Sequence, residues 1–249
     1  MTQSLTILSG VTRGLGAAMA AQLMKQPGHL VTLSRKASDA LAETAHAHHK
    51  KMTQIEVDLS IGAEVERAAA ELSALIGKPS SLRVIHNAGV VTPIAQAQDF
   101  KDLQKINTTF QINITAPIFL TAHILSASAH VKDRRIMLIS SGAGRNPTSG
   151  WGVYCATKAA MDRYAECAQL DVGDTARIVS MAPGLVDTPM QAVIRSTDVA
   201  DFPNLEKFVG FHQQNQLVSP EVVSSRLLTV FESDAFGTKT IDDIRQHNF

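Results

Sequence analysis

The stretch LTILSGVTRGLG, residues 5–16, decides the fold that the sequence predicts. Its first four residues are a short apolar run typical of a buried strand, and residues 17–24 continue it with an apolar pattern typical of a helix. Gly10, Gly14 and Gly16 lie between the two, where a backbone that turns tightly can approach a phosphate. The following helix would offer free N–H groups and the positive end of its dipole to that phosphate. A glycine-rich loop without function is the alternative for the glycines alone, but the order strand, glycine turn, helix favours dinucleotide binding.

The alternation of strand-like runs and helical patterns continues along the chain. We expect further strands at residues 30–33, 52–57, 82–86, 135–140, 176–181 and 239–244, and helices at 38–50, 61–76, 99–129, 154–170 and 220–233. No internal repeat, linker or low-complexity tract interrupts this order. The sequence therefore predicts an α/β fold of the Rossmann type, a doubly wound and mainly parallel seven-stranded sheet with helices on both faces. We expect one domain over residues 1–249.

Composition and charge limit the classes of partner. Of 249 residues 45% are hydrophobic, Lys+Arg and Asp+Glu both total 23, and no basic excess indicates nucleic acid. The first strand begins almost at Met1, leaving no room for a signal sequence, and no apolar run approaches the roughly 20 residues of a membrane span. Cys155 and Cys167 lie about 18 Å apart on one expected helix, so they cannot pair. We expect a cytoplasmic protein with a small-molecule substrate and no nucleic acid or membrane partner.

Residue types typical of ligand sites follow the expected strands. In a parallel sheet the ligand lies outside the carboxyl ends of the strands. These ends carry Gly10–Gly16, Arg35, Asp58, Asn87–Gly89, Ser140–Ser141 and Pro183–Gly184. Six strand ends of this kind are hard to ascribe to packing.

Two arginines predict which dinucleotide binds. Arg35 follows the second strand, where an acidic residue would bind the 2′-hydroxyl of NAD, and Arg13 lies in the glycine turn. Either arginine alone is well explained as a solvated surface residue, but together they favour the 2′-phosphate of NADP, because a planar guanidinium suits phosphate. Asp58, after the third strand, either caps the next helix or contacts adenine.

The stretch SSGAGRNPTSGWGVYCATK, residues 140–158, contains the groups for carbonyl chemistry. Tyr154 and Lys158 are four residues apart on an expected helix and therefore share one of its faces. Strand alternation points Ser140 and Ser141 to opposite sides, so one of the two faces the cleft. A hydroxyl, a phenol and a cation brought together can protonate a carbonyl oxygen, although an isolated Tyr-x-x-x-Lys pair is more often a solvated helix face.

Three other segments have less specific patterns. Asn113 is a poor residue for a helix interior, and Pro117 cannot donate to its carbonyl, so we expect a kink in helix 99–129, either a tolerated defect or a site. The long mixed segment 186–217 beside the cleft is a candidate substrate lid or an ordinary surface excursion. The histidines of residues 46–49 lack the carboxylate or cysteine of a metal site, and we expect no metal.

Several motifs stand together in order and at characteristic spacing: Gly10-x3-Gly14-x-Gly16, Asn87-Ala88-Gly89, Asn113, Ser141, Tyr154-x3-Lys158 and Pro183-Gly184 with Thr188. On these motifs the chain resembles the short-chain dehydrogenases/reductases over essentially its whole length. Two departures are mild, because Ser9 stands where threonine is usual and His86 stands where asparagine is usual. The resemblance implies that NADP(H) is bound by Gly10, Thr12, Arg13, Gly14, Leu15, Gly16, Arg35, Asp58, Leu59, Asn87, Ala88, Gly89, Tyr154, Lys158, Pro183, Gly184, Val186 and Thr188.

The resemblance also implies catalytic roles for four residues. It selects Ser141 over Ser140 as the hydroxyl that holds the carbonyl oxygen, with Tyr154 as the general acid. Lys158 would bind the nicotinamide ribose, and Asn113 would hold a water that relays protons to it. We expect the Lys158 cation and the nicotinamide charge to lower the pKa of Tyr154 from about 10.

A narrower likeness lies in residues 140–158, in APGLVDTPMQ and in DFPNLEKF, which look like bacterial benzil reductases and sepiapterin reductases. It implies an NADPH-dependent carbonyl reductase acting on a diketone or a pterin side-chain carbonyl. Ser141, Trp151, Tyr154, Met190 and Asp242 would contact the substrate, but Trp151 is equally explained by packing and Asp242 by a capping or edge-strand role. The alternatives are a redox-sensing regulator that binds NADP(H) without turnover and an alcohol dehydrogenase working in the oxidative direction. Family likeness suggests a homodimer or homotetramer through helices 99–129 and 154–170.

Overall fold

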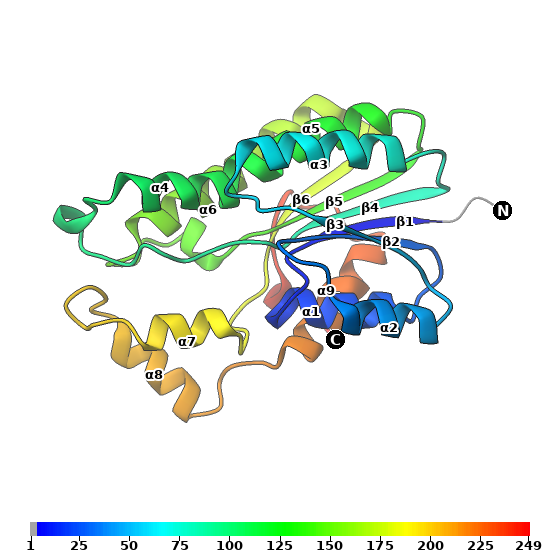
Figure 1. The fold of residues 1–249 in the computed structure, drawn as a ribbon. Coiled ribbons are helices and arrows are strands. Elements are labelled where there is room, and N and C mark those ends of the chain that lie inside the picture. The colour runs from blue at the N-terminus through cyan, green and yellow to red at the C-terminus, as the bar shows by residue number, and fades with distance from the viewer. Residues whose placement is uncertain (1–3) are drawn as a thin grey trace.

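The computed structural model describes residues 4–249, and its centre is a parallel sheet (Figure 1). Within these residues the sheet has seven strands in the order β3-β2-β1-β4-β5-β6-β7, and every strand pairing is parallel. The strands are β1 Leu5–Ser9, β2 His29–Ser34, β3 Lys51–Glu56, β4 Ser81–His86, β5 Asp133–Ile139, β6 Arg177–Ala182 and β7 Ile241–Asp243. The predicted Rossmann-type sheet is confirmed.

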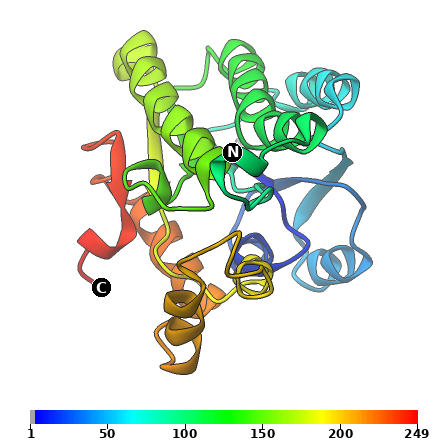
Figure 2. The ribbon, with the colours of Figure 1, turned by 90° about the vertical axis from the view of Figure 1, so that its left-hand side faces the viewer.

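Helices cover both faces of the sheet, as Figures 1 and 2 show. They are α1 Gly14–Leu23, α2 Asp39–Ala47, α3 Gly62–Leu75, α4 Leu103–Phe110, α5 Ala116–Ala127, α6 Gly152–Val172, α7 Pro189–Arg195, α8 Leu205–Gln213 and α9 Pro220–Glu232. One face carries α1, α2 and α9, and the other carries α3, α5 and α6. The pair α7 and α8 lies beyond the carboxyl ends of the strands, away from both layers.

The two helical layers enclose two apolar cores. Successive residues of a strand point to opposite faces of the sheet, so Ile7 and Leu8 of β1 enter different cores. Ile136 of β5 joins the core under α3, α5 and α6, and Met137 joins the core under α1 and α9. Both faces of the strands are therefore buried, which explains why their sequences read as continuous apolar runs.

The expected helix 99–129 contains the predicted interruption. A π-helical turn, Gln111–Thr115, separates α4 from α5 and has Asn113 at its centre. Pro117 lies at the start of α5, where its missing N–H removes one hydrogen bond of the regular helix. A π-helical turn holds more residues than a regular turn of α-helix. It therefore offsets the side chains of α5 from the positions that a regular continuation of α4 would give them.

One long helix is apolar on average. The continuous helix Leu103–Ala127 is 25 residues long and, by length and composition alone, apolar enough to cross a membrane. Core helices of α/β domains pass the same test, and Ala116, Leu120 and Ile124 of this helix are buried in the core beside α3.

Candidate active site

A cavity of about 680 Å³ opens at the carboxyl edge of the sheet, between the strand ends and α7. All of the residues predicted for catalysis, cofactor or substrate line it except Asn113 and Asp242. Residues from six strand ends therefore meet in one place, as parallel strands require. Among residues 4–249, no group of three or more His, Cys, Asp or Glu side chains is placed to hold a metal ion.

The glycine turn between β1 and α1 is held against the end of β4. Gly10 adopts a φ of +74°, and a Cβ on Gly16 would overlap the carbonyl oxygen of Gly10. The Asn87 amide donates to the carbonyls of Ser9 and Gly10 at 3.1 and 3.0 Å. The hydroxyl of Ser9 accepts from the backbone N–H groups of Asn87 and Ala88. Serine thus supplies the hydroxyl at a position where family members have threonine.

His86, the second departure from the family pattern, has a hydrogen-bond partner inside the fold. Its side chain is buried and its Nε2 lies 2.9 Å from the hydroxyl of Thr121 on α5. Burial lowers the pKa of His86 to about 4, so the ring is neutral at pH 7. The residue joins the end of β4 to α5 and presents no charge to the cavity.

The predicted 2′-phosphate site lies at the ends of β1, β2 and β3. Arg13 and Arg35 both line the cavity and are exposed. The Asp58 carboxylate accepts from the hydroxyl and the N–H of Ser60 at 2.7 and 2.9 Å. These hydrogen bonds, with a smaller contribution from Arg35, lower the pKa of Asp58. Asp58 thus stabilises the turn before α3. It also lines the cavity, and its contact with adenine stays a prediction.

Ser141, Tyr154 and Lys158 meet at the other end of the cavity. Ser141 follows β5 in an extended conformation, and α6 carries the other two residues on one buried face. The Lys158 ammonium donates to the carbonyl of Ile139 at 2.8 Å and lies 5.7 Å from the centre of the Tyr154 ring. A hydroxyl, a phenol and an ammonium therefore share one wall.

The expected lowering of the tyrosine pKa is wrong for the chain by itself. Burial raises the pKa of Tyr154 to about 12, and a hydrogen bond with Ser141 opposes this only in part. Burial also lowers the pKa of Lys158 to about 8, against the charge of Asp162. Desolvation disfavours both charged forms and is the largest influence on each of the two pKa values.

Asn113 lies behind the cavity wall and does not line it. Its side-chain oxygen accepts from the N–H of Val90 at 2.9 Å, and its amide donates to the carbonyl of Val90 and the hydroxyl of Thr157. A Cβ on Gly89 would lie 3.3 Å from Asn113 Oδ1 and 3.7 Å from the Lys158 nitrogen. The side chain therefore joins the π-helical turn to the segment after β4 and to α6, within a short distance of Lys158.

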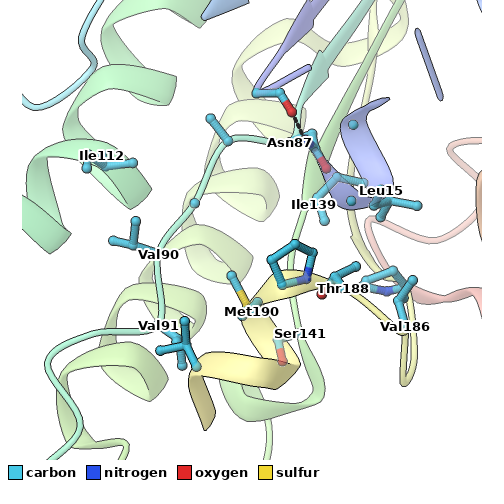
Figure 3. A pocket seen from close by; sticks show the side chains of 18 of the residues that line it. Leu15, Asn87, Val90, Val91, Ile112, Ile139, Ser141, Val186, Thr188 and Met190 are labelled. Atoms are coloured by element: carbon cyan, nitrogen blue, oxygen red, sulfur yellow. Dashed lines mark hydrogen bonds between the residues drawn. The ribbon is translucent and has the colours of Figure 1, made fainter. Parts of the chain in front are cut away.

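Apolar and aromatic side chains form the wall beside Ser141 and Tyr154. Trp151 is buried and stacks on Phe202, with centroids 5.0 Å apart and planes 14° apart, and its edge contacts Tyr154 and Phe208. Figure 3 shows Met190 near Ser141, with Val90 and Val91 across the pocket. Trp151 thus both packs and lines the cavity, so the two sequence interpretations are compatible.

Other lining residues were missed by sequence reasoning. They include Val90, Val91, Ile112, Gln191, Ile194, Phe208 and Arg245. They come from several loops and helices, and no periodic pattern distinguishes an apolar residue facing a cavity from one facing the core. The sequence does not indicate Arg245 either. This residue is distant from Gly184 in the chain and reaches it only through the turn after β7.

The structure does not bring Asp242 to the cavity. Its carboxylate is 5% exposed, accepts from the N–H of Asp243 and lies 2.9 Å from Nε2 of His247. Asp242 sits in the edge strand β7, where alternation turns its side chain toward the C-terminal residues. The edge-strand interpretation accounts for the residue, and the predicted substrate contact has no support in this geometry.

A known protein family matches most of the chain, and this match agrees with the observed fold and site. The family profile described as short chain dehydrogenase matches residues 5–199. The chain belongs to the short chain dehydrogenase family. It is accordingly an oxidoreductase of that family, in which the hydroxyl, phenol and ammonium at the cavity wall are the expected reactive groups.

Similar proteins agree with this assignment. The chain is 34% identical to a benzil reductase ((S)-benzoin forming) from Bacillus cereus, over 92% of this chain and 94% of that protein. It is 30% identical to a sepiapterin reductase from Xenopus tropicalis, over 93% of this chain and 92% of the relative. A crystal structure of a short-chain dehydrogenase/reductase from Burkholderia vietnamiensis is 32% identical, covers 99% of both chains and superposes with a TM-score of 0.68.

Proposed function

We propose that this short chain dehydrogenase is an NADPH-dependent carbonyl reductase. The observation that carries the proposal is the cavity that Ser141, Tyr154 and Lys158 share with the glycine turn at Gly10. Binding and proton-transfer groups thus face one space large enough for a dinucleotide and a small substrate. The same residues without a common cavity would support no reaction.

The residues at the glycine turn fit NADP(H). A Cβ on Gly16 would overlap the backbone, so the glycine keeps the start of α1 close to β1 and its N–H groups open to a pyrophosphate. Arg13 and Arg35 would hold the 2′-phosphate, a role that suits two exposed guanidinium groups on the cavity wall. When bound, NADPH supplies the hydride that reduces the carbonyl carbon.

The buried wall fits proton transfer to a carbonyl oxygen. A Tyr154 pKa of about 12 keeps the phenol protonated at neutral pH, as a general acid requires. The Lys158 ammonium would stabilise the phenolate after the proton has left, and Ser141 would donate to the oxygen as negative charge develops. Asn113 would act from behind, by fixing the π-helical turn whose backbone is the candidate site for a relaying water.

The substrate side of the cavity supports an apolar carbonyl compound. Trp151, Met190 and Phe208 provide flat and apolar surface beside Tyr154. Two relatives are named for benzil and sepiapterin, and these compounds carry carbonyl groups next to an aromatic ring or in a side chain on a ring. We therefore propose a diketone or a pterin side-chain carbonyl as the substrate.

The arrangement of the whole chain is also part of the proposal. We infer one domain over residues 1–249 with a substrate lid at 186–217, because α7 and Phe208 of this segment line the cavity. Exposed Leu103, Phe110 and Leu170 on α4 and α6 support a homodimer or homotetramer through these helices. The two free cysteines suit a cytoplasmic location.

A substrate panel tests the function. NADPH oxidation would be followed at saturating cofactor with benzil, other diketones and sepiapterin, and again with NADH in place of NADPH. We expect reduction of at least one carbonyl compound and a preference for NADPH. Cofactor binding without turnover of any carbonyl would overturn the proposal and indicate a redox-sensing regulator, whereas faster oxidation of the product alcohol than reduction would indicate an alcohol dehydrogenase.

A further inference from the structure

Asp162 is a buried carboxylate one helical turn beyond Lys158. Tyr154, Lys158 and Asp162 follow one another at a spacing of four residues on α6, so they form one stripe of that helix. All three are buried, with exposed fractions of 6, 6 and 7%. A carboxylate at such a position is costly unless it is paired and hydrogen-bonded.

The carboxylate joins three segments of the cavity wall. Oδ1 accepts from the hydroxyls of Ser140 and Ser180, each at 2.6 Å, and Oδ2 accepts from Nε of Arg145 at 3.1 Å. Hydroxyl donors at this distance are typical of an ionised carboxylate acceptor. The donors come from the end of β5, from the loop before α6 and from β6, so one side chain fixes three segments to α6.

The bond to Asp162 fixes the direction of the Ser140 hydroxyl. Ser140 is buried and its hydroxyl is turned to Asp162, while Ser141 is the next residue in an extended backbone. Successive side chains of extended backbone point to opposite sides. Both serines line the cavity, but the Ser140 hydroxyl is bonded to Asp162, so Ser141 is the serine whose hydroxyl does not bind that carboxylate.

Asp162 is also the carboxylate whose charge acts on Lys158. From α6, Tyr154 and Asp162 face the ammonium, and Arg145 is paired with Asp162 from the loop. On β7 the carboxylate of Asp242 is turned to His247, and that of Asp243 to Arg245. Burial lowers the pKa of Lys158 to about 8, and Asp162 opposes this shift.

We propose that Asp162 is a positioning residue of the catalytic centre, which orients Ser141 through Ser140 and keeps Lys158 protonated through its charge. The inference rests on the proposed carbonyl reductase function. It assigns the buried part of α6 a role beyond the Tyr154 and Lys158 pair, because the carboxylate acts on both the serine and the lysine.

The pH profile of Asp162→Asn tests the proposal. Reduction needs a charged Lys158, so kcat falls as pH rises through the pKa of that ammonium, near 8 in the wild type. The asparagine keeps the size of the side chain and removes its charge. We expect the falling limb to move to lower pH by about one unit, with a lower kcat and an unchanged dissociation constant for NADPH measured by fluorescence.

Asp171→Asn is the matched control, because Asp171 is an exposed carboxylate on the same helix. Its profile should coincide with that of the wild type. A folded Asp162→Asn enzyme whose falling limb stays at the wild-type pH overturns the inference, and leaves the proposed function intact. A wild type that reduces no carbonyl compound instead removes the function on which the inference rests.

Arg145→Met decides the question if circular dichroism shows that Asp162→Asn does not fold. The Arg145 side chain is 26% exposed, so its loss is less disruptive than that of a fully buried group. Removing the guanidinium leaves the charge of Asp162 unopposed, which raises the pKa of Lys158. A falling limb at higher pH than in the wild type supports the proposal, and an unchanged limb overturns it.

Discussion

Burial has the largest effect on the pKa values of the two candidate reactive residues. Tyr154 and Lys158 are almost completely buried, and burial disfavours the phenolate and the ammonium alike. The result is a phenol that keeps its proton and an amine that titrates near pH 8. A pair of this kind is suited to donating a proton to a carbonyl oxygen at neutral pH.

Tyr154→Phe removes only the hydroxyl and should abolish carbonyl reduction. The phenylalanine ring keeps the contact with Trp151, whose centroid lies 5.5 Å from that of Tyr154, so the cavity wall should stay in place. We expect kcat to fall by at least about a hundredfold, with NADPH binding retained. Stopped-flow reduction and fluorescence titration measure the two quantities, and a folded variant that still turns over at the wild-type rate would exclude the phenol as the acid.

Arg35→Ala should weaken NADPH selectively. Loss of a charged hydrogen bond to the 2′-phosphate should raise the KM for NADPH by roughly tenfold to a hundredfold, with little effect on the KM for NADH. Lys36→Ala is the control, because Lys36 is an exposed neighbour that does not line the cavity. Equal losses with both cofactors would show that Arg35 does not bind the phosphate.

His86→Asn should reduce the sensitivity of the fold to mild acid. The folded-state pKa of about 4 lies below the ordinary 6.5, so the unfolded chain binds the proton first and stability falls as pH drops from 6.5 toward 4. The contribution is on the order of 3 kcal/mol, and it is fully present above pH 6.5. Urea unfolding at pH 7 and 4.5 measures it, with the exposed His48→Asn as control; a loss between the two pH values that is as large in His86→Asn as in the wild type would contradict the assignment.

At the scale of elements, the turn between β1 and α1 positions the candidate cofactor site. The turn is fixed from two directions, by the close approach of Gly16 to Gly10 and by the hydrogen bonds of Asn87 at the end of β4. A backbone held in this way gives the N–H groups at the start of α1 a constant direction toward the cavity. Rigid elements thus position a site made of loops.

Gly16→Ala should therefore damage both folding and cofactor binding. The added methyl group would overlap the Gly10 carbonyl, and overpacking of this kind costs about 1–3 kcal/mol or more. Gly62→Ala provides the contrast, because nothing lies within 4 Å of its Cβ position and alanine favours the helix by about 0.5–1 kcal/mol. Thermal unfolding and NADPH titration of both variants measure the difference, and a fully stable, cofactor-binding Gly16→Ala would refute the close approach.

At the scale of the whole molecule, the sheet edge and the segment 186–217 enclose the cavity together. The contact between them is aromatic, because Phe202 and Phe208 pack on Trp151 from the far side of the cavity. Figure 1 shows α7 and α8 beyond the carboxyl ends of the strands. The segment shares a small apolar core with the cavity wall, formed by residues Val91, Ala143, Trp151, Tyr154, Ile194, Phe202 and Phe208. We propose that substrate access depends on this shared core.

Phe202→Ala should loosen this segment and weaken substrate binding. Phe202 is fully buried, and removal of its ring leaves a cavity that costs about 3–5 kcal/mol of local packing. We expect the KM for the carbonyl substrate to rise by about tenfold or more, while the KM for NADPH stays within about twofold. Val199→Ala, a truncation at an exposed site of the same segment, is the control, and an unchanged substrate KM in Phe202→Ala would argue against a lid.

Local sequence by itself determined the order of the strands and of the helices that cover the sheet, the glycine turn, the interruption at Asn113 and the face shared by Tyr154 and Lys158. It left α7 and α8 within an unassigned mixed segment. The features that it determined depend on backbone preferences and spacing within a few residues, which composition and periodicity record directly. The parallel sheet followed, because strands joined by helices can pair in few ways. The cavity at the carboxyl edge followed from the sheet.

The tertiary structure alone decided the properties that depend on distant segments. Burial set the pKa values of Tyr154 and Lys158, and the partners of Asp162 come from loops and strands with no local pattern. The side chain of Asp242 points to His247 because of its position in the edge strand β7. The desolvation and hydrogen bonding of a group depend on all the atoms that pack around it. The sequence therefore identifies these residues, but only the folded chain determines their charge and the direction of their side chains.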